Sequence, residues 1–112
     1  MEIAQYNIVL VNLNSAINHD DNGAEIRKIR PCVVISPDEM NRYLRTVVVA
    51  PMTTRSRIAP TRVRVRHNQK PGYVIVDQIR TVDRKRIVRS LGKLTQAEIR
   101  KLKRVIKETY VD

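Results

Sequence analysis

Short runs of aliphatic, mostly β-branched residues recur along this 112-residue chain, and aromatic residues contribute almost nothing to them. The sequence contains four Tyr and no Phe or Trp, so Val, Ile and Leu must supply nearly all of a buried core. Short β-branched runs favour strands. We predict strands over residues 8–13, 32–36 and 46–50, the last an almost uninterrupted Val run that is typical of a strand buried on both faces. Pro51 is expected to end regular ladder pairing.

Residues 61–67 alternate Val with Arg, which places the Val side chains on one face of a strand and the Arg side chains on the other. Turn-forming residues follow at Asn68, Lys70, Pro71 and Gly72, and residues 73–77 read as a second strand, so the two segments predict a hairpin. The Arg row has two open interpretations. It either protects a solvated edge from aggregation or follows the phosphates of a nucleic acid.

The C-terminal part predicts one more strand and a helix. The strand is predicted over residues 87–94, and Thr95 and Glu98 then have the spacing of a capping box. The helix that follows carries Ile99, Leu102, Val105 and Ile106 on one stripe, for packing on the sheet or on a dimer partner. With a short helical segment near residues 37–41 and a long polar loop over 14–28, the expected class is α+β, a curled antiparallel sheet in a single domain over residues 1–112.

The charge of the chain predicts an anionic partner. Twenty-two Lys and Arg against eleven acidic residues give a net charge of +11, which favours nucleic acid or an acidic protein. Cys32 is the one cysteine, so no disulfide can form within the chain, and its apolar surroundings predict a buried, inert thiol. The N-terminus does not read as a signal peptide and no segment has bilayer length, so we expect a cytoplasmic protein without a membrane partner.

The residue types disfavour most catalytic schemes but leave RNA cleavage open. The two His residues, His19 and His67, are far apart and no spacing resembles a zinc site, while three Gly are too few for a phosphate-binding loop. RNA carries its own nucleophile, the 2′-hydroxyl, so an enzyme needs only a base, a cation for the developing charge and a proton for the leaving oxygen. Clusters at 23–31, 51–54 and 77–83 supply carboxylates, Arg and hydroxyls.

These clusters, taken in order, resemble the MazF/PemK toxins over nearly the whole chain. The Arg-Pro pair before residues 32–34 and the block Asp-Gln-Ile-Arg-Thr-Val-Asp at 77–83 are the most specific parts of the match. The resemblance implies an SH3-like small antiparallel β-barrel with a C-terminal helix, acting as a homodimer. It also implies cleavage of single-stranded mRNA at a short sequence, leaving 2′,3′-cyclic phosphate and 5′-hydroxyl ends. No metal or other cofactor is implied, and an acidic cognate antitoxin is the expected inhibitor.

The resemblance also assigns roles to residues. Arg30 would be the principal catalytic residue, as proton donor or phosphorane stabiliser, and Thr53 would bind the scissile phosphate. Either Asp77 or Glu25 would be the general base. The expected RNA-binding residues are Thr54, Gln78, Arg80, Arg27 and Lys28. Two positions depart from the family pattern: Tyr6-Asn7 replaces the usual Gly and acid before the first strand, and Ile75 stands where some members carry an Arg.

Two other functions fit the same expected fold. A non-catalytic gyrase poison of the CcdB type would depend on its C-terminal helix and would not use Arg30 or Thr53. A plain SH3-like RNA-binding module would need the basic surface but no reactive cluster.

Overall fold

The computed structural model describes residues 2–14, 29–55 and 59–112, so Glu25, Arg27 and Lys28 lie outside the described residues. The elements of the described part, in chain order, are β1 (Asn7–Asn12), β2 (Ile29–Val34), α1 (Asp38–Tyr43), β3 (Thr46–Thr53), β4 (Arg62–His67), β5 (Lys70–Ile75), the 3-10 turn η1 (Val76–Gln78), β6 (Arg80–Asp83), the 3-10 turn η2 (Arg84–Arg86), β7 (Ile87–Lys93), α2 (Gln96–Ile106) and the π-helical turn η3 (Lys107–Val111).

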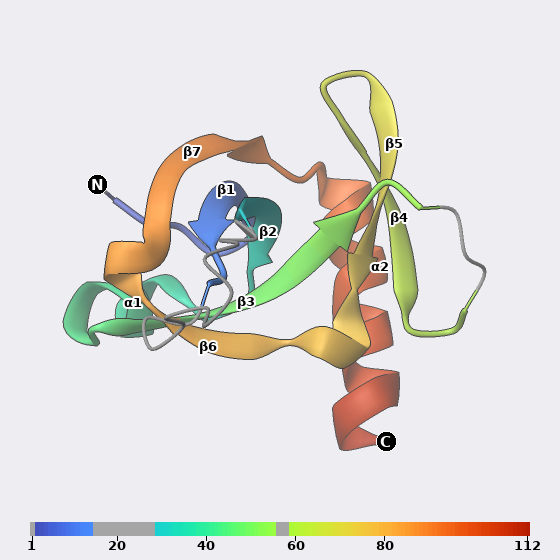
Figure 1. Cartoon of the computed structure of the whole chain (residues 1–112). Coiled ribbons are helices and arrows are strands. Elements are labelled where there is room, and N and C mark those ends of the chain that lie inside the picture. Colours follow the sequence, from blue (N-terminus) through green and yellow to red (C-terminus); the bar gives the residue numbers. More distant parts are fainter. Residues whose placement is uncertain (1, 15–28, 56–58) are drawn as a thin grey trace, which may run out of the picture.

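The strands form one curled antiparallel sheet in which β3 links two halves. Their order is β4-β5-β3-β2-β1-β7, and β6 also pairs with β3. The first part of β3 pairs with β6 and β2, whereas Met52 and Thr53 at its end pair with β5. Figure 1 shows β3 running from the group of β1, β2, β6 and β7 to the β4–β5 hairpin, beside which α2 lies. The predicted class, a small curled antiparallel sheet with a C-terminal helix, is confirmed, and the sheet has the form of a half-barrel.

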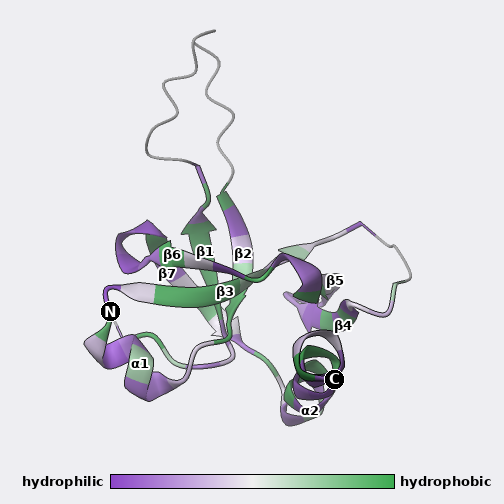
Figure 2. Ribbon diagram, turned by 90° about the horizontal axis from the view of Figure 1, so that it is seen from below, coloured by the Kyte–Doolittle hydropathy of each residue, from purple (hydrophilic) through white to green (hydrophobic). Residues whose placement is uncertain are grey.

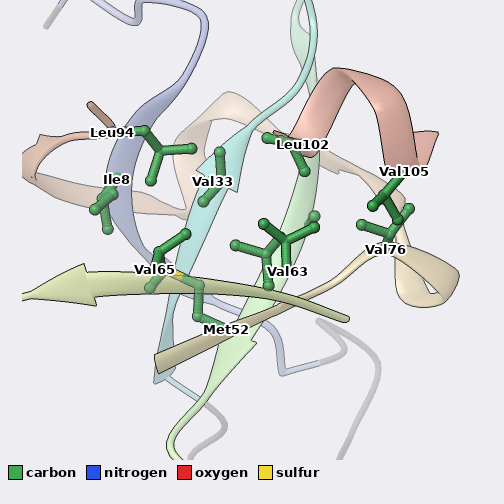
Figure 3. Close-up of a cluster of buried hydrophobic side chains, with 11 residues drawn as sticks. Ile8, Val33, Met52, Val63, Val65, Val76, Leu94, Leu102 and Val105 are labelled. Carbon is green, nitrogen blue, oxygen red and sulfur yellow. The ribbon is translucent and has the colours of Figure 1, made fainter. Parts of the chain in front are cut away.

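Two clusters of buried side chains occupy opposite faces of β2 and β3. Val33, Ala50 and Met52 belong to the first cluster, which includes Leu102 and Val105 of α2 (Figure 3). The second cluster takes the alternate residues of the same strands, as the two-residue period of a strand requires. Its members on β2 and β3 are Cys32, Val34, Val47 and Val49.

The C-terminal helix forms as its sequence predicts. The Thr95 hydroxyl accepts the Glu98 N–H at 3.2 Å, and the Glu98 carboxylate accepts the Thr95 N–H at 2.8 Å, which completes the capping box. Leu102 and Val105 are buried, and Ile99 and Ile106 pack at the margin of the first cluster. The apolar stripe therefore covers this chain's own sheet. No helix in the described ranges is long and apolar enough to cross a membrane.

The expected end of the third strand at Pro51 is wrong. Pro51 still pairs with Cys32 of β2, and β3 continues to Thr53. A proline has no N–H to donate to a ladder, so it favours a point where the pairing partner changes. After Pro51 the pairing with β2 stops, and Met52 and Thr53 pair with β5 on the other side of β3. Figure 2 shows β3, hydrophobic over much of its length, passing between the two halves of the molecule.

The hairpin turn is tighter than the sequence predicts. His67 of β4 pairs with Lys70 of β5, so Asn68 and Gln69 alone form the turn. Both have positive φ, 53° and 62°, which is typical of the type I′ turns that match the twist of a hairpin. Lys70, Pro71 and Gly72 therefore belong to β5, and the strand ends at Ile75, before Asp77.

Candidate active site

Arg30 lies at the boundary between two pockets and lines both of them. Its side chain is exposed, near the start of β2. The larger pocket, of about 430 Å³, is lined by Arg30, Pro31, Met52, Thr53, Thr54, Arg55, His67, Asn68, Lys70, Pro71 and Gly72. The smaller pocket, of about 320 Å³, is lined by Leu13, Arg30, Pro51, Gln78 and Arg80. Segments that are far apart in the sequence thus meet around one guanidinium.

The register of β2 and β3 explains why Arg30 and Thr53 lie together. Cys32 pairs with Pro51 at the end of this ladder, and Arg30 and Thr53 each lie two residues beyond that pair and line the same pocket. Side chains alternate along a strand, so Arg30 shares the face of Cys32 and Thr53 shares the face of Val49, and both extend the face of the second core cluster. Pro31 and Pro51 have no N–H groups, which ends the ladder between β2 and β3 at the edge of both pockets.

The Thr53 hydroxyl is held at the end of β3. Its oxygen accepts the backbone N–H of Arg55 at 3.2 Å. A hydroxyl that accepts this bond keeps its own proton to donate, and that proton suits an anionic oxygen. Thr53 therefore presents a hydrogen-bond donor at the larger pocket beside Arg30.

The buried Cys32 thiol lies near the positive charges of Arg80 and Arg30. Cys32 is fully buried, as the sequence predicts, and its Sγ donates to the Arg30 carbonyl at 3.6 Å. Burial raises the pKa of this thiol to about 12, and the positive charges of Arg80 and then Arg30 act against that rise. Arg30 and Arg80 also line the same pocket, the smaller one. Two cations at one end of the sheet provide a site for an anion such as a phosphate.

The turn η1 and strand β6 supply the wall of the smaller pocket, through Gln78 and Arg80. Arg80 pairs with Val49 of β3, which brings it to this end of the sheet. Asp77 is exposed and lines neither of these two pockets, although Gln78 beside it lines the smaller one. The structure thus groups Arg30 with Thr53 and Thr54 on one side and with Gln78 and Arg80 on the other.

Hairpin residues complete the larger pocket, and the sequence did not indicate them as site residues. His67, Asn68 and Lys70 line it from the β4–β5 turn. The Glu98 carboxylate, which caps α2, also accepts the Arg66 N–H at 2.7 Å, so one side chain joins the helix start to the strand that precedes the turn. The two residues of this contact are 32 positions apart, so no local sequence motif predicts it. Within the described ranges, no three His, Cys, Asp or Glu side chains gather in a way that could hold a metal ion.

Comparison with known proteins identifies the family. The family of PemK-like, MazF-like toxins of type II toxin-antitoxin systems matches residues 4–110. The chain belongs to this family. It is 33% identical over 90 residues to an Endoribonuclease MazF from Staphylococcus saprophyticus, a match that covers 75% of each chain. The family predicted from the sequence is confirmed, and this relative supports the predicted enzyme class.

Solved structures with a MazF-like fold cover almost the whole chain. MazF from Deinococcus radiodurans superposes with a TM-score of 0.80 at 20% identity, covering 100% of this chain and 99% of its own. An endoribonuclease from a mycobacterial species, solved in complex with its cognate antitoxin, superposes with a TM-score of 0.76 at 23% identity, covering 95% and 92%. At these identities the likeness is one of fold.

Proposed function

We propose that this endoribonuclease toxin of the MazF/PemK kind cuts single-stranded RNA within a short recognition sequence and without a metal ion. The RNA 2′-hydroxyl attacks the adjacent phosphate, leaving a 2′,3′-cyclic phosphate and a 5′-hydroxyl. The observation that carries the proposal is the position of Arg30, which lines both pockets and shares the larger one with Thr53.

The proposed reaction uses groups that the chain supplies. A carboxylate, Asp77 or Glu25, takes the proton of the 2′-hydroxyl as the O2′–P bond forms. The Arg30 guanidinium stabilises the charge on the phosphorane, because it stays protonated and offers several donors in one plane. Thr53 donates its hydroxyl proton as a hydrogen bond to a non-bridging oxygen and so orients the phosphate. The P–O5′ bond breaks as O5′ receives a proton; in the alternative role of Arg30, its guanidinium donates this proton and regains one from solvent.

RNA on either side of the scissile phosphate would occupy the two pockets. Gln78 and Arg80 line the smaller pocket and are proposed to bind the RNA there, and Thr54 lines the larger one with a second hydroxyl. Arg27 and Lys28 precede Arg30 in the sequence and are proposed to add positive charge for the phosphates. Protein side chains can reach the bases of RNA when these are unpaired, which supports a single-stranded substrate.

We further propose a homodimer that a cognate antitoxin inhibits. The antitoxin complexes of the mycobacterial endoribonuclease and of MazF from Deinococcus radiodurans support an antitoxin partner. The net charge of +11 suits an acidic, flexible antitoxin segment that competes with RNA for the same cationic surface.

Cleavage in the presence of EDTA tests the proposed chemistry. Purified protein is incubated with a mixed-sequence single-stranded RNA. The fragment ends are then sequenced, and the fragment masses are measured by mass spectrometry. We expect cuts at discrete sites, with fragment masses that correspond to 2′,3′-cyclic phosphate ends. Uncut RNA at micromolar protein would exclude the nuclease and leave the gyrase poison or the plain binding module, whereas 3′-hydroxyl ends would exclude attack by the 2′-hydroxyl.

A further inference from the structure

Thr53 is the first member of a row of side chains that crosses three strands. Thr53 of β3 pairs directly with Tyr73 of β5, and Tyr73 pairs directly with Arg64 of β4. Directly opposite residues of an antiparallel ladder share a face and lie side by side. The row Thr53, Tyr73 and Arg64, here called the Tyr73 row, therefore runs outward from the candidate active site along one face.

The neighbouring row shows which face this is. Met52, Val74 and Val63 pair in the same order across the three strands, and all three are buried in the first core cluster, which α2 covers. Because side chains alternate along a strand, the Tyr73 row lies on the opposite face. Tyr73 is partly exposed and Arg64 is exposed. Strands lie about 4.8 Å apart, so Arg64 is about 10 Å from Thr53, the scale of neighbouring nucleotides and not of the reacting atoms.

The charge of this face favours a polyanion. Arg62 and Arg66 share the face of Arg64 because they alternate with the buried Val63 and Val65. Among the described residues, the ion pair within 4.0 Å joins Arg104 and Glu108, and no carboxylate in those ranges pairs with the three β4 arginines. The guanidinium groups of Arg62 and Arg66 thus flank the row that ends at Arg64.

Tyr73 adds a feature that a merely solvated basic edge does not need. The chain has four aromatic residues, all Tyr. Tyr6 packs against the first cluster and Tyr110 bonds to the Val76 carbonyl, while Tyr43 lies on α1. Tyr73 is the one that pairs directly with Thr53. Aromatic rings beside cationic groups bind single strands by base stacking, and this mode is tolerant of sequence.

We propose that the Tyr73 row binds the part of the RNA that flanks the scissile phosphate: an unpaired base stacks on Tyr73, and the phosphate next to it binds Arg64. The inference rests on the proposed function and assigns an additional RNA subsite to it. Tyr73 and Arg64 are binding residues and take no part in the bond changes. The alternative occupant of this face, a second copy of the chain, is an outcome of the test.

Matched RNAs and variants test the subsite. One RNA carries the cleaved sequence intact, and others carry a single abasic nucleotide at one or two positions on either side of the cut. Wild type, Tyr73→Ala, Tyr73→Phe and Arg64→Ala are compared, and Arg100→Ala on the exposed side of α2 is the control. Initial rates give kcat and KM, fluorescence anisotropy gives Kd for each RNA, and sedimentation gives the oligomeric state.

We expect Tyr73→Ala to lower kcat/KM about tenfold, mainly through KM, because base stacking on an aromatic side chain contributes about that much. Tyr73→Phe should stay close to wild type. With wild type, one of the abasic RNAs should show the same loss of kcat/KM relative to the intact RNA. With Tyr73→Ala, that abasic RNA should show no further loss. Arg64→Ala should make the logarithm of Kd less dependent on the logarithm of salt concentration, by a slope of about 0.7.

Several results would overturn the subsite. These are additive losses from the abasic RNA and Tyr73→Ala, equal loss in Tyr73→Phe, an Arg64→Ala salt slope like that of Arg100→Ala, or a change of oligomeric state in Tyr73→Ala. If Tyr73→Ala unfolds, the measurements on Tyr73→Phe, Arg64→Ala and the abasic RNAs still test the subsite. If wild type does not cut RNA, the proposed function fails, and the anisotropy series tests binding at Tyr73 separately.

Discussion

The Tyr110 hydroxyl donates a hydrogen bond to the Val76 carbonyl at 2.6 Å. Tyr110 belongs to the π-helical turn that ends the chain, and Val76 begins η1, whose last residue, Gln78, lines the smaller pocket. The end of the C-terminal helix thus fixes the backbone beside Asp77 and Gln78. Glu98, at the start of the same helix, fixes β4 beside His67 of the larger pocket.

Removing the Tyr110 hydroxyl should affect activity more than folding. Tyr110→Phe keeps the ring and loses one hydrogen bond, worth about 1 kcal/mol, so the free energy of unfolding should fall by no more than that. We expect a several-fold lower kcat with little change in KM, because η1 loses a fixed position rather than a contact with RNA. Steady-state cleavage and urea unfolding measure both. Tyr43→Phe, on a side chain that is 79% exposed, is the matched control and should change neither. An unchanged kcat in Tyr110→Phe would contradict this role.

Variants of Thr95 and Glu98 distinguish the contribution of the helix cap to stability from that of the hairpin contact. Thr95→Ala removes one half of the capping box and should lower the free energy of unfolding by about 1 kcal/mol. Glu98→Ala removes the acceptor of both the Thr95 and the Arg66 N–H groups, so we expect a larger loss of stability together with faster hydrogen exchange at the Arg66 amide. Equal exchange at Arg66 in the two variants would show that the hairpin contact contributes nothing.

The proposed general base is either Asp77 or Glu25, and an isosteric pair of variants decides between them. Asp77→Asn and Glu25→Gln each remove one carboxylate charge at nearly constant size. The variant that lacks the base should lose about 100-fold or more in kcat, and its pH–rate profile should lose the acidic limb. The other variant should retain that limb. Full activity in both variants would exclude both assignments.

The Cys32 thiol should make the protein less stable at alkaline pH. Its pKa is raised to about 12 in the folded chain by burial, against the ordinary value of 9.0, so above pH 9 the unfolded chain loses a proton that the folded chain retains. Stability from this group is therefore complete below pH 9 and falls as pH rises towards 12. We expect the unfolding free energy of wild type to fall relative to that of Cys32→Ala as the pH rises from 9 to 11. A constant difference by urea unfolding would refute this.

Local chemistry made much of the fold predictable. Thr95 and Glu98 indicate the start of α2 because both halves of a capping box lie within one turn, and the Val–Arg alternation identifies β4 and its buried face. The Asn68–Gln69 turn was harder, because Gly is absent from the two positions with positive φ. Strand β6 (Arg80–Asp83) was not foreseen, because four residues carry too short a pattern to identify a strand.

The candidate site was predictable only in part, because its geometry is non-local. The resemblance pointed to Arg30 and Thr53, but their meeting depends on the pairing of β2 with β3. The Tyr110–Val76 and Glu98–Arg66 contacts join residues 34 and 32 positions apart, and His67 reaches the larger pocket through a turn of the hairpin. Such contacts follow from the assembled sheet and helix and leave no motif in the sequence.

Single-turnover cleavage by Arg30→Ala tests the central claim most directly. Wild type, Arg30→Ala and the control Arg89→Ala, on β7, are mixed in excess with one end-labelled single-stranded RNA in EDTA, and sedimentation and circular dichroism confirm that each is folded and equally assembled. If Arg30 stabilises the phosphorane, the rate constant of Arg30→Ala should fall by about 100-fold or more, the typical effect of losing one such donor, and Arg89→Ala should match wild type. An Arg30→Ala rate within a few-fold of wild type would contradict the account.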